Sequence, residues 1–302
     1  MLFDNGTDSG RAGVVDRIID LSEAIEALDF MPAQRAALTV RGLSHLSGML
    51  RLLWTGQAGL ATIARTAAER STNARKHGRL LSEAQLLAPV PRPGKIVAIG
   101  RNYADHAKET GVQPFEKPRI IAKLPSSVCA PGTCVRKPRS VNKLDFEAEL
   151  GVVIGALASN VTRERAYEVV AGYTVLNDLS AREFQFDVAP PQTTFAKSMD
   201  GFCPMGPWLV TKDEIANPQR LDIKSSVNGT PMQHGNSADM LFPIDRIIEY
   251  LSEFMTLEPG DVIATGTPAG SGAFRDPPVW LQPGDHVRIE IDQVGVLEHE
   301  IG

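Results

Sequence analysis

The feature that most constrains the fold is a change of sequence pattern near residue 94. From Lys95 to the C-terminus the chain consists of short apolar runs separated by glycine and proline: IVAIG, RIIAK, FEAELGVVIG, YTVLND, GPWLV, DVIAT and HVRIEI. Runs of this length, bounded by turn residues, are typical of strands. Two longer helical patterns interrupt them, over 163–171 and 244–255. This part of the chain is predicted to be built mostly from sheet.

The residues before this point follow a helical pattern. Apolar side chains recur at helical spacing within 13–87, most clearly Ile18, Ile19, Leu21, Ile25 and Leu28, and alanine-rich segments follow. The segment 87–95, LAPVPRPGK, contains three prolines and a glycine, which disfavour a continuing helix and suit a linker. We therefore predict a smaller, mainly helical domain over 1–93 and a larger domain over 94–302.

Charge and composition exclude several classes of function. The formal net charge is -5 and no block of lysine or arginine makes a basic stripe, so nucleic acid is not an expected partner. The first twenty residues lack the apolar core of a signal peptide, and no later stretch is long enough to span a bilayer, which favours a cytoplasmic location without a membrane partner. The three cysteines form no CxxC pair, which argues against structural zinc.

The segment 144–155, LDFEAELGVVIG, carries the most informative carboxylates. Residues two apart on a strand share a face, so Glu147 and Glu149 point the same way, with Asp145 on that side too. Asp178 ends the run YTVLND, where a strand passes into a polar turn. Crowded carboxylates need either a proton or a cation, and an oxygen-only set favours Mg²⁺, Mn²⁺ or Ca²⁺ over zinc. The alternative is an exposed acidic strand edge.

Three further segments carry candidate site residues. His106 and Glu109 lie three apart on a short predicted helix within 100–111, a spacing suited to a water-activating pair or to an ordinary surface pair. Lys197, in the loop AKSMDGFCP, could pair with a substrate carboxylate or an enolate, or be solvated. In ATGTPAGSG the backbone N–H groups of Gly266 and Thr267 could approach an anion, unless this is a plain turn.

Taken together, these segments resemble the fumarylacetoacetate hydrolase family, in particular its smaller acylpyruvase-like members, from about Lys95 to Gly302. The matching motifs occur in the family's order: GRNYADHAKE, EAE, NDLSAR, KSMD and TGTPAGSG. The resemblance implies an α+β fold, with a mixed β-roll catalytic domain after the helical N-terminal domain, and a homodimer.

The resemblance also implies roles for individual residues. Glu147, Glu149 and Asp178 would bind one divalent metal, with Mg²⁺ favoured over Mn²⁺ or Ca²⁺. His106 and Glu109 would be the catalytic pair on a mobile lid. The remaining catalytic and substrate-contact assignments are Lys197 as a catalytic residue, and Arg101, Tyr103, Lys123, Gly266 and Thr267 as substrate contacts.

The implied activity is hydrolysis of a carbon–carbon bond in a small 2,4-dioxo acid, such as an acylpyruvate or fumarylpyruvate, through a metal-bound enolate. An isomerase, decarboxylase or tautomerase acting on a related unsaturated dioate or on oxaloacetate is the alternative, because each passes through the same enolate. A non-catalytic protein with a structural Ca²⁺ is the more distant one. The runs LPSSVCAPG and FQFDVAPPQTTFAK depart from many relatives where the substrate pocket is shaped, so the substrate is the least transferable property.

Overall fold

The computed structural model describes residues 2–3, 17–18, 79–81, 84–109, 111, 113 and 115–302. For residues 2–3, 17–18 and 79–80 it describes the backbone alone. The chain divides into two compact units, Met1–Leu86 and Leu87–Gly302. In the first unit, strands β1 (Leu2–Phe3), β2 (Arg17–Ile18) and β3 (Arg79–Leu80) form an antiparallel sheet in the order β1-β2-β3. The helices predicted within 13–87 fall almost entirely outside the described residues.

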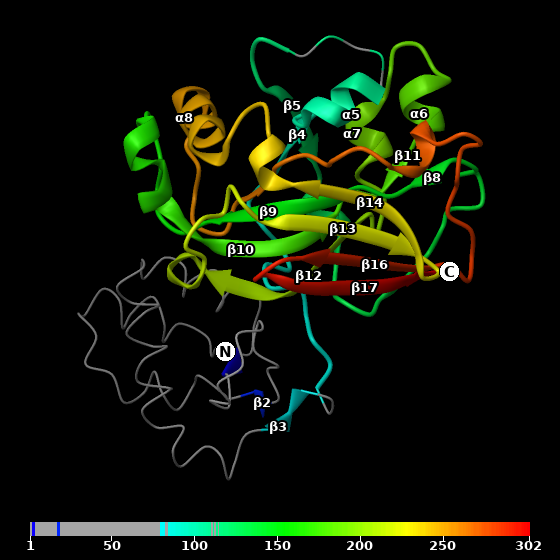
Figure 1. The fold of residues 1–302 in the computed structure, drawn as a ribbon, viewed down its shortest axis with the longest axis horizontal. Helices are drawn as coiled ribbons and strands as arrows, with labels where there is room; N and C mark the ends of the chain where they lie inside the picture. The colour runs from blue at the N-terminus through cyan, green and yellow to red at the C-terminus, as the bar shows by residue number, and fades with distance from the viewer. Residues whose placement is uncertain are drawn as a thin grey trace. The chain divides into compact units, whose positions relative to one another are not determined.

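The second unit is built on two larger sheets (Figure 1). The seven-stranded sheet is mixed, because β15 runs parallel to β4 and β12 parallel to β6. In sheet order its strands are β5 (Arg119–Lys123), β4 (Ile96–Gly100), β15 (Val262–Ala264), β9 (Ala148–Ile154), β10 (Val170–Asn177), β12 (Cys203–Thr211) and β6 (Val128–Cys129).

The five-stranded sheet lies alongside the first, with β17 in contact with β10 and β12. In sheet order its strands are β14 (Thr230–Asn236), β13 (Asp222–Val227), β16 (His286–Ile291), β17 (Gly295–Ile301) and β7 (Cys134–Val135). A separate pair joins β11 (Ser180–Ala181) to β8 (Leu144–Asp145). Mixed sheets with few helices confirm the predicted β-roll character of this unit.

Helices in the described residues are short. The α-helices are α5 (Ala104–Glu109), α6 (Glu183–Phe186), α7 (Thr193–Ala196) and α8 (Ile244–Phe254). The 3₁₀ helices are η2 (Pro125–Ser127), η3 (Arg163–Val169), η4 (Lys212–Glu214), η5 (Ser237–Asp239) and η6 (Gly272–Phe274). None of the helices described is long and apolar enough to cross a membrane.

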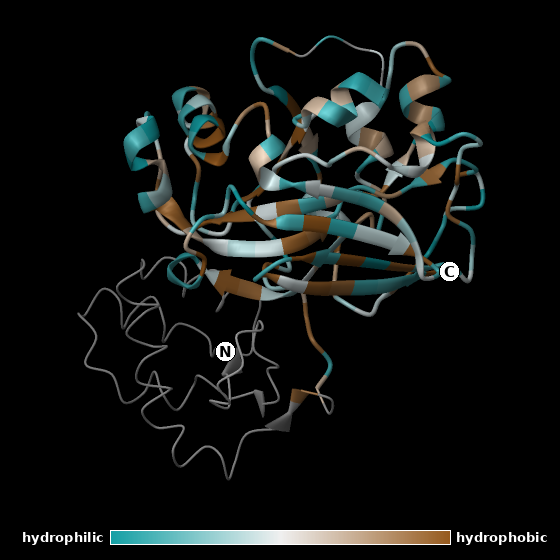
Figure 2. Cartoon of the chain, in the orientation of Figure 1, coloured by the Kyte–Doolittle hydropathy of each residue, from teal (hydrophilic) through white to brown (hydrophobic). Residues whose placement is uncertain are grey.

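The two helices predicted within the sheet-rich part have different outcomes. The prediction over 244–255 is confirmed by α8, which buries Ile244, Ile247, Ile248 and Leu251. Figure 2 shows brown apolar and teal polar segments along the ribbon of this helix. The prediction over 163–171 is wrong in type and length. That segment is the 3₁₀ helix η3, and Val170 already pairs with Ile154 as the first residue of β10. Its β-branched valines favour the extended strand over further helical turns.

The pairing of β9 with β10 positions the candidate site. Both strands are buried along their whole length, which explains their continuous apolar runs. The antiparallel register places Leu176 opposite Glu149 and Asn177 opposite Ala148. Beyond the last pair, the Asp178 N–H donates to the Glu147 carbonyl, 2.9 Å away. The start of one strand and the end of its neighbour therefore bring the predicted acidic residues to one place.

Candidate active site

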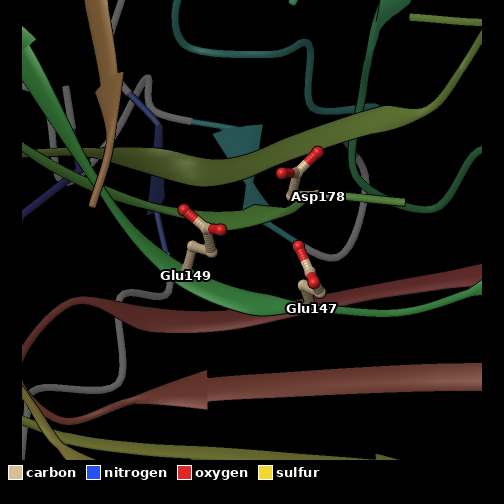
Figure 3. A group of neighbouring side chains, drawn as sticks. All are labelled: Glu147, Glu149 and Asp178. Atoms are coloured by element: carbon tan, nitrogen blue, oxygen red, sulfur yellow. The ribbon is translucent and has the colours of Figure 1, made fainter. Parts of the chain in front are cut away.

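Glu147, Glu149 and Asp178 form a buried carboxylate cluster. One oxygen from each lies within 4.8 Å of the others, and the three residues are at most 5% exposed. Figure 3 shows Glu147 and Glu149 on the segment that leads into and along β9, with Asp178 facing them from the end of β10. The sequence-based expectation that these residues converge is met. Three buried carboxylates this close repel one another unless positive charge lies nearby.

A chain of hydrogen bonds behind the cluster fixes Glu147. The Glu147 N–H donates to Asn177 Oδ1 at 3.0 Å, and Asn177 Nδ2 lies 2.8 Å from His299 Nε2. Burial lowers the pKa of His299 to about 4, so its imidazole is neutral near pH 7. A neutral ring whose Nε2 accepts from the Asn177 amide leaves Asn177 Oδ1 free to accept from Glu147. His299 on β17 thereby ties the second sheet to the cluster.

Three cations neutralise two of the carboxylates. Arg182 places its guanidinium 2.5 Å from Glu147 Oε1, and the Lys197 ammonium lies 2.7 Å from Glu147 Oε2 and 2.5 Å from Asp178 Oδ2. Lys123 Nζ lies 2.6 Å from Asp178 Oδ1. Burial acts to raise the pKa of Glu147, but Arg182 and Lys197 outweigh burial and hold that pKa well below its usual range. Glu147 is therefore ionised across the physiological range.

Glu149 is the exception. Its Oε2 accepts the Gly266 N–H at 2.8 Å, and no ammonium or guanidinium group in the described part of the chain lies within ion-pair distance of it. Burial, together with the charges of Asp178 and Glu147, raises the pKa of Glu149 well above its usual value. An oxygen-only donor set with one uncompensated carboxylate fits a hard divalent cation. The three residues present thus suit the predicted metal.

The predicted His106–Glu109 pair is present on α5. His106 Nδ1 lies 2.7 Å from Glu109 Oε1, and the Gly270 N–H donates to Glu109 Oε2 at 3.1 Å, which holds the helix against the loop after β15. The His106 ring packs edge-on against Phe274, with 5.4 Å between centroids. If Nδ1 carries the proton donated to Glu109, Nε2 is left as the basic nitrogen.

A cavity of about 200 Å³ joins these groups. It is lined by the carboxylate cluster, by His106 and Lys197, and by a set of further polar and aromatic side chains. Its further lining residues include Arg101, Arg119, Ile121, Arg182, Gln185, Phe186, Gly266, Thr267 and Phe274. Carboxylates, cations and a histidine thus share one small polar pocket, as catalysis on a small anion requires.

Two predicted substrate contacts are not on this cavity. Tyr103 is fully buried in the hydrophobic core and does not line the pocket, so the predicted direct contact has no support in the structure. Lys123 does not line the pocket either; its ammonium contacts Asp178 and donates to the carbonyls of Phe202 and Lys197. Lys123 therefore supports a carboxylate of the cluster, and its contact with substrate stays a prediction.

Gly266 and Thr267 line the cavity, but their polar groups are engaged with the protein. The Gly266 N–H, expected to meet a substrate anion, donates to Glu149. The Thr267 hydroxyl donates to the Ala148 carbonyl and lies 2.7 Å from Gln233 Nε2. Both residues position β9 and its metal-ligand candidates in the structure. Their contact with substrate stays a prediction.

Arg182 is a site residue that the sequence reasoning missed. Its guanidinium group bridges Glu147 and Asp145, and the distance to Asp145 Oδ2 is 2.8 Å. The same group makes cation–π contacts with the rings of Phe186 and Phe274. Asp145, grouped with the glutamates from its spacing, instead accepts from Arg182 and the Gly272 N–H and stays outside the cluster. The signal for Arg182 was the arginine that ends NDLSAR, four residues after Asp178.

Replacing Gly266 by alanine is expected to destabilise the domain by several kcal/mol. Gly266 has φ of 100°, and an added Cβ would lie 2.7 Å from Asn102 Cβ and 3.0 Å from the Ile99 carbonyl oxygen. Gly284→Ala is the matched control, because Gly284 has φ of 93° but no atom within 4 Å of the added carbon. Chemical denaturation should give a larger loss for Gly266→Ala. Equal losses in the two variants would show that the close approach contributes nothing.

Comparison with known proteins supports the resemblance. Residues 95–302 match the family described as fumarylacetoacetate (FAA) hydrolase C-terminal. The chain is 42% identical over 253 residues to the mitochondrial oxaloacetate tautomerase fahd2 of Xenopus laevis. The aligned region covers 84% of this chain and 78% of that protein. It is 46% identical over 226 residues to the oxaloacetate tautomerase YisK of Bacillus subtilis, covering 74% of each.

A solved structure agrees in fold. The 5-carboxymethyl-2-hydroxymuconate delta-isomerase of Mycobacterium smegmatis superposes with a TM-score of 0.65 and 37% identity, covering 74% of this chain and 84% of that one. These proteins bear the names of tautomerases and an isomerase. They agree better with the alternative activity predicted from the sequence than with carbon–carbon hydrolysis.

Proposed function

Since the chain belongs to the fumarylacetoacetate hydrolase family, an enzyme family, we propose that it is a metal-dependent tautomerase or isomerase of small 2-oxo acids, with oxaloacetate as the first substrate to test. The observation that carries the proposal is the shared cavity: Glu147, Glu149 and Asp178 face the same small space as His106. A structural calcium site would need no histidine oriented by a carboxylate beside it.

The carboxylate cluster would hold the metal. Bound at Glu147, Glu149 and Asp178, a divalent cation such as Mg²⁺ would supply positive charge for the oxygen atoms of a 2-oxo acid. Mn²⁺ and Ca²⁺ have the same preference for oxygen ligands. The positive charge of the metal would favour the ionised form of Glu149, whose pKa is raised by burial and by the neighbouring carboxylates.

Tautomerisation moves one proton between C3 of the substrate and the oxygen on C2. His106 is suited to the transfer at C3, because Glu109 orients its ring and its basic nitrogen belongs to a side chain that lines the cavity. Lys197 would stabilise negative charge on the C2 oxygen through the charge of its ammonium group. The three donors of that group lie within hydrogen-bond distance of Glu147, Asp178 and Ser180. Burial acts to lower the pKa of Lys197, but Asp178 and Glu147 outweigh burial and raise it, so the ammonium stays protonated.

Carbon–carbon hydrolysis would use the same residues differently, with His106 activating a water molecule against a distal carbonyl. The names of the relatives support the tautomerase or isomerase activity over this one. A homodimer, a cytoplasmic location and the absence of nucleic-acid and membrane partners stay predictions.

The test is to follow the decay of freshly dissolved oxaloacetate enol by its ultraviolet absorbance. We expect the protein with Mg²⁺ to accelerate the conversion to the keto form by about 10²-fold or more, as acid–base catalysis allows. Chelation should return the rate to background, and Mg²⁺ should restore it. A rate that is the same with and without metal, or faster cleavage of an acylpyruvate than tautomerisation of oxaloacetate, would refute the proposal.

A further inference from the structure

One face of strand β5 presents two side chains to the cavity and a third to the carboxylate cluster. Residues 119, 121 and 123 share one face of the strand because side chains alternate along it. Lys123, at the inner end, contacts Asp178, and Ile121 and Arg119 line the cavity. The Cα atoms of Arg119 and Lys123 are separated by four residues, or about 13 Å of strand. Arg119 therefore belongs to the end of the cavity away from the carboxylate cluster.

The pairing of β4 with β5 brings a second arginine beside the first. Gly100 is the partner of Arg119 in the antiparallel register, and Arg101 follows Gly100 directly. A Cβ at Gly100 would lie 3.4 Å from Arg119 Cδ and 3.7 Å from Arg119 Cγ, so the Arg119 side chain passes across the glycine. Arg101 has a φ of 56°, a conformation that non-glycine residues rarely adopt. The backbone thus places both arginines at one end of the cavity.

Both guanidinium groups lie near the same aromatic ring, that of Phe115. Their Cζ atoms lie 5.7 Å (Arg101) and 5.9 Å (Arg119) from the centroid of Phe115. Both arginines are partly buried. Burial, followed by the charges of Arg119 and Arg182, lowers the pKa of Arg101. Two like charges are therefore held close together in a partly desolvated place, at an electrostatic cost that an anion would remove.

Within the part of the chain that the structure describes, Arg101 and Arg119 differ from the other cations of the site in having no carboxylate partner. Lys123, Arg182 and Lys197 each contact carboxylates of the cluster or Asp145. No carboxylate among the described residues lies within ion-pair distance of Arg101 or Arg119. Their guanidinium donors are available to a ligand, and a planar fork of donors matches a carboxylate.

We propose that Arg101 and Arg119 form a second anion-binding point that receives the distal carboxylate of the substrate, so that the enzyme selects 2-oxo dioates over 2-oxo monocarboxylates. The proposal rests on the proposed function for the reacting end of the substrate, which would lie at the carboxylate cluster. Arg119 is then a specificity-determining residue, and it lies outside the motifs that carry the family resemblance.

The test compares two inert ligands that differ in the distal carboxylate. Malate and lactate share a 2-hydroxy acid group, and only malate has a second carboxylate. Titration calorimetry in the presence of Mg²⁺ should show malate binding to the wild type about 10-fold or more tightly than lactate, as hydrogen bonds to a charged group allow. Arg119→Gln and Arg101→Gln should each reduce this ratio to within about 3-fold by weakening malate alone. Arg119→Lys should recover part of it.

Arg165→Gln is the matched control, because it removes the same charge from an exposed side chain that pairs with Glu168 and does not line the cavity. The proposal would be overturned if the ratio of malate affinity to lactate affinity stays at the wild-type value in both pocket variants. It would also be overturned if the ratio falls equally in the control. The oxaloacetate enol assay separates this outcome from failure of the proposed function. A wild type that prefers malate but does not tautomerise oxaloacetate would retain the anion-binding point and lose the activity.

Discussion

Replacement of Glu149 by glutamine is expected to lower kcat/KM for oxaloacetate by about 10³-fold or more. The substitution preserves the shape of the side chain and an acceptor for the Gly266 N–H, but it removes the charge of the one cluster carboxylate that has no cation partner in the described part of the chain. The metal site would lose a ligand charge that nothing nearby replaces. Two measurements should fall together: the turnover rate at saturating Mg²⁺, and the affinity for Mn²⁺ measured by calorimetry.

Asp261→Asn is the control for this variant. Asp261 is as buried as Glu149, and its carboxylate contacts Lys95 at 2.5 Å, away from the residues that line the cavity. It should lose stability but keep Mn²⁺ binding and turnover. Near-normal turnover of Glu149→Gln at ordinary Mg²⁺ concentrations would contradict the assignment of Glu149 as a ligand.

Replacement of His106 by glutamine is expected to lower kcat by about 10² to 10⁴-fold while leaving Mn²⁺ affinity within about twofold. His106 lines the cavity but is not one of the clustered carboxylates, and its bond to Glu109 gives it an orientation suited to proton transfer. Loss of the group should therefore affect the proton transfer and not the assembly of the metal site. Steady-state kinetics and calorimetry on the same preparation measure the two properties.

His234→Gln provides the matched control for this substitution. His234 is exposed on β14 and does not line the cavity, so its variant should match the wild type in both assays. If His106→Gln keeps its turnover, the proton-transfer role is wrong. If it instead loses Mn²⁺ along with activity, His106 belongs to the assembly of the metal site.

Several parts of the fold and site followed from local sequence. Strand periodicity located β4, β5 and β16, and the spacing of two glutamates on one strand, with an aspartate where another ends, predicted the cluster. Helical spacing likewise predicted the His106–Glu109 pair. In each case the deciding information lies within a few residues, or in the rule that paired strands bring their ends together.

What the sequence did not reveal depends on contacts between distant segments. The cations of Lys123, Arg182 and Lys197 reach carboxylates that lie 19 or more positions away along the chain, and their partners cannot be read from spacing. Tyr103 occurs in a motif shared with relatives, yet its ring packs into the core. A motif alone does not show whether a residue serves packing or chemistry. The arginine pair required the β4–β5 register.

The central claim is that three carboxylates from adjacent strand ends bind one divalent cation in the catalytic cavity. Anomalous diffraction from crystals grown with Mn²⁺ tests it most directly. The account predicts one strong Mn²⁺ peak within about 2.4 Å of an oxygen atom from each of Glu147, Glu149 and Asp178. A Mn²⁺ ion found elsewhere, or a carboxylate cluster without Mn²⁺ at saturating metal, would contradict the account.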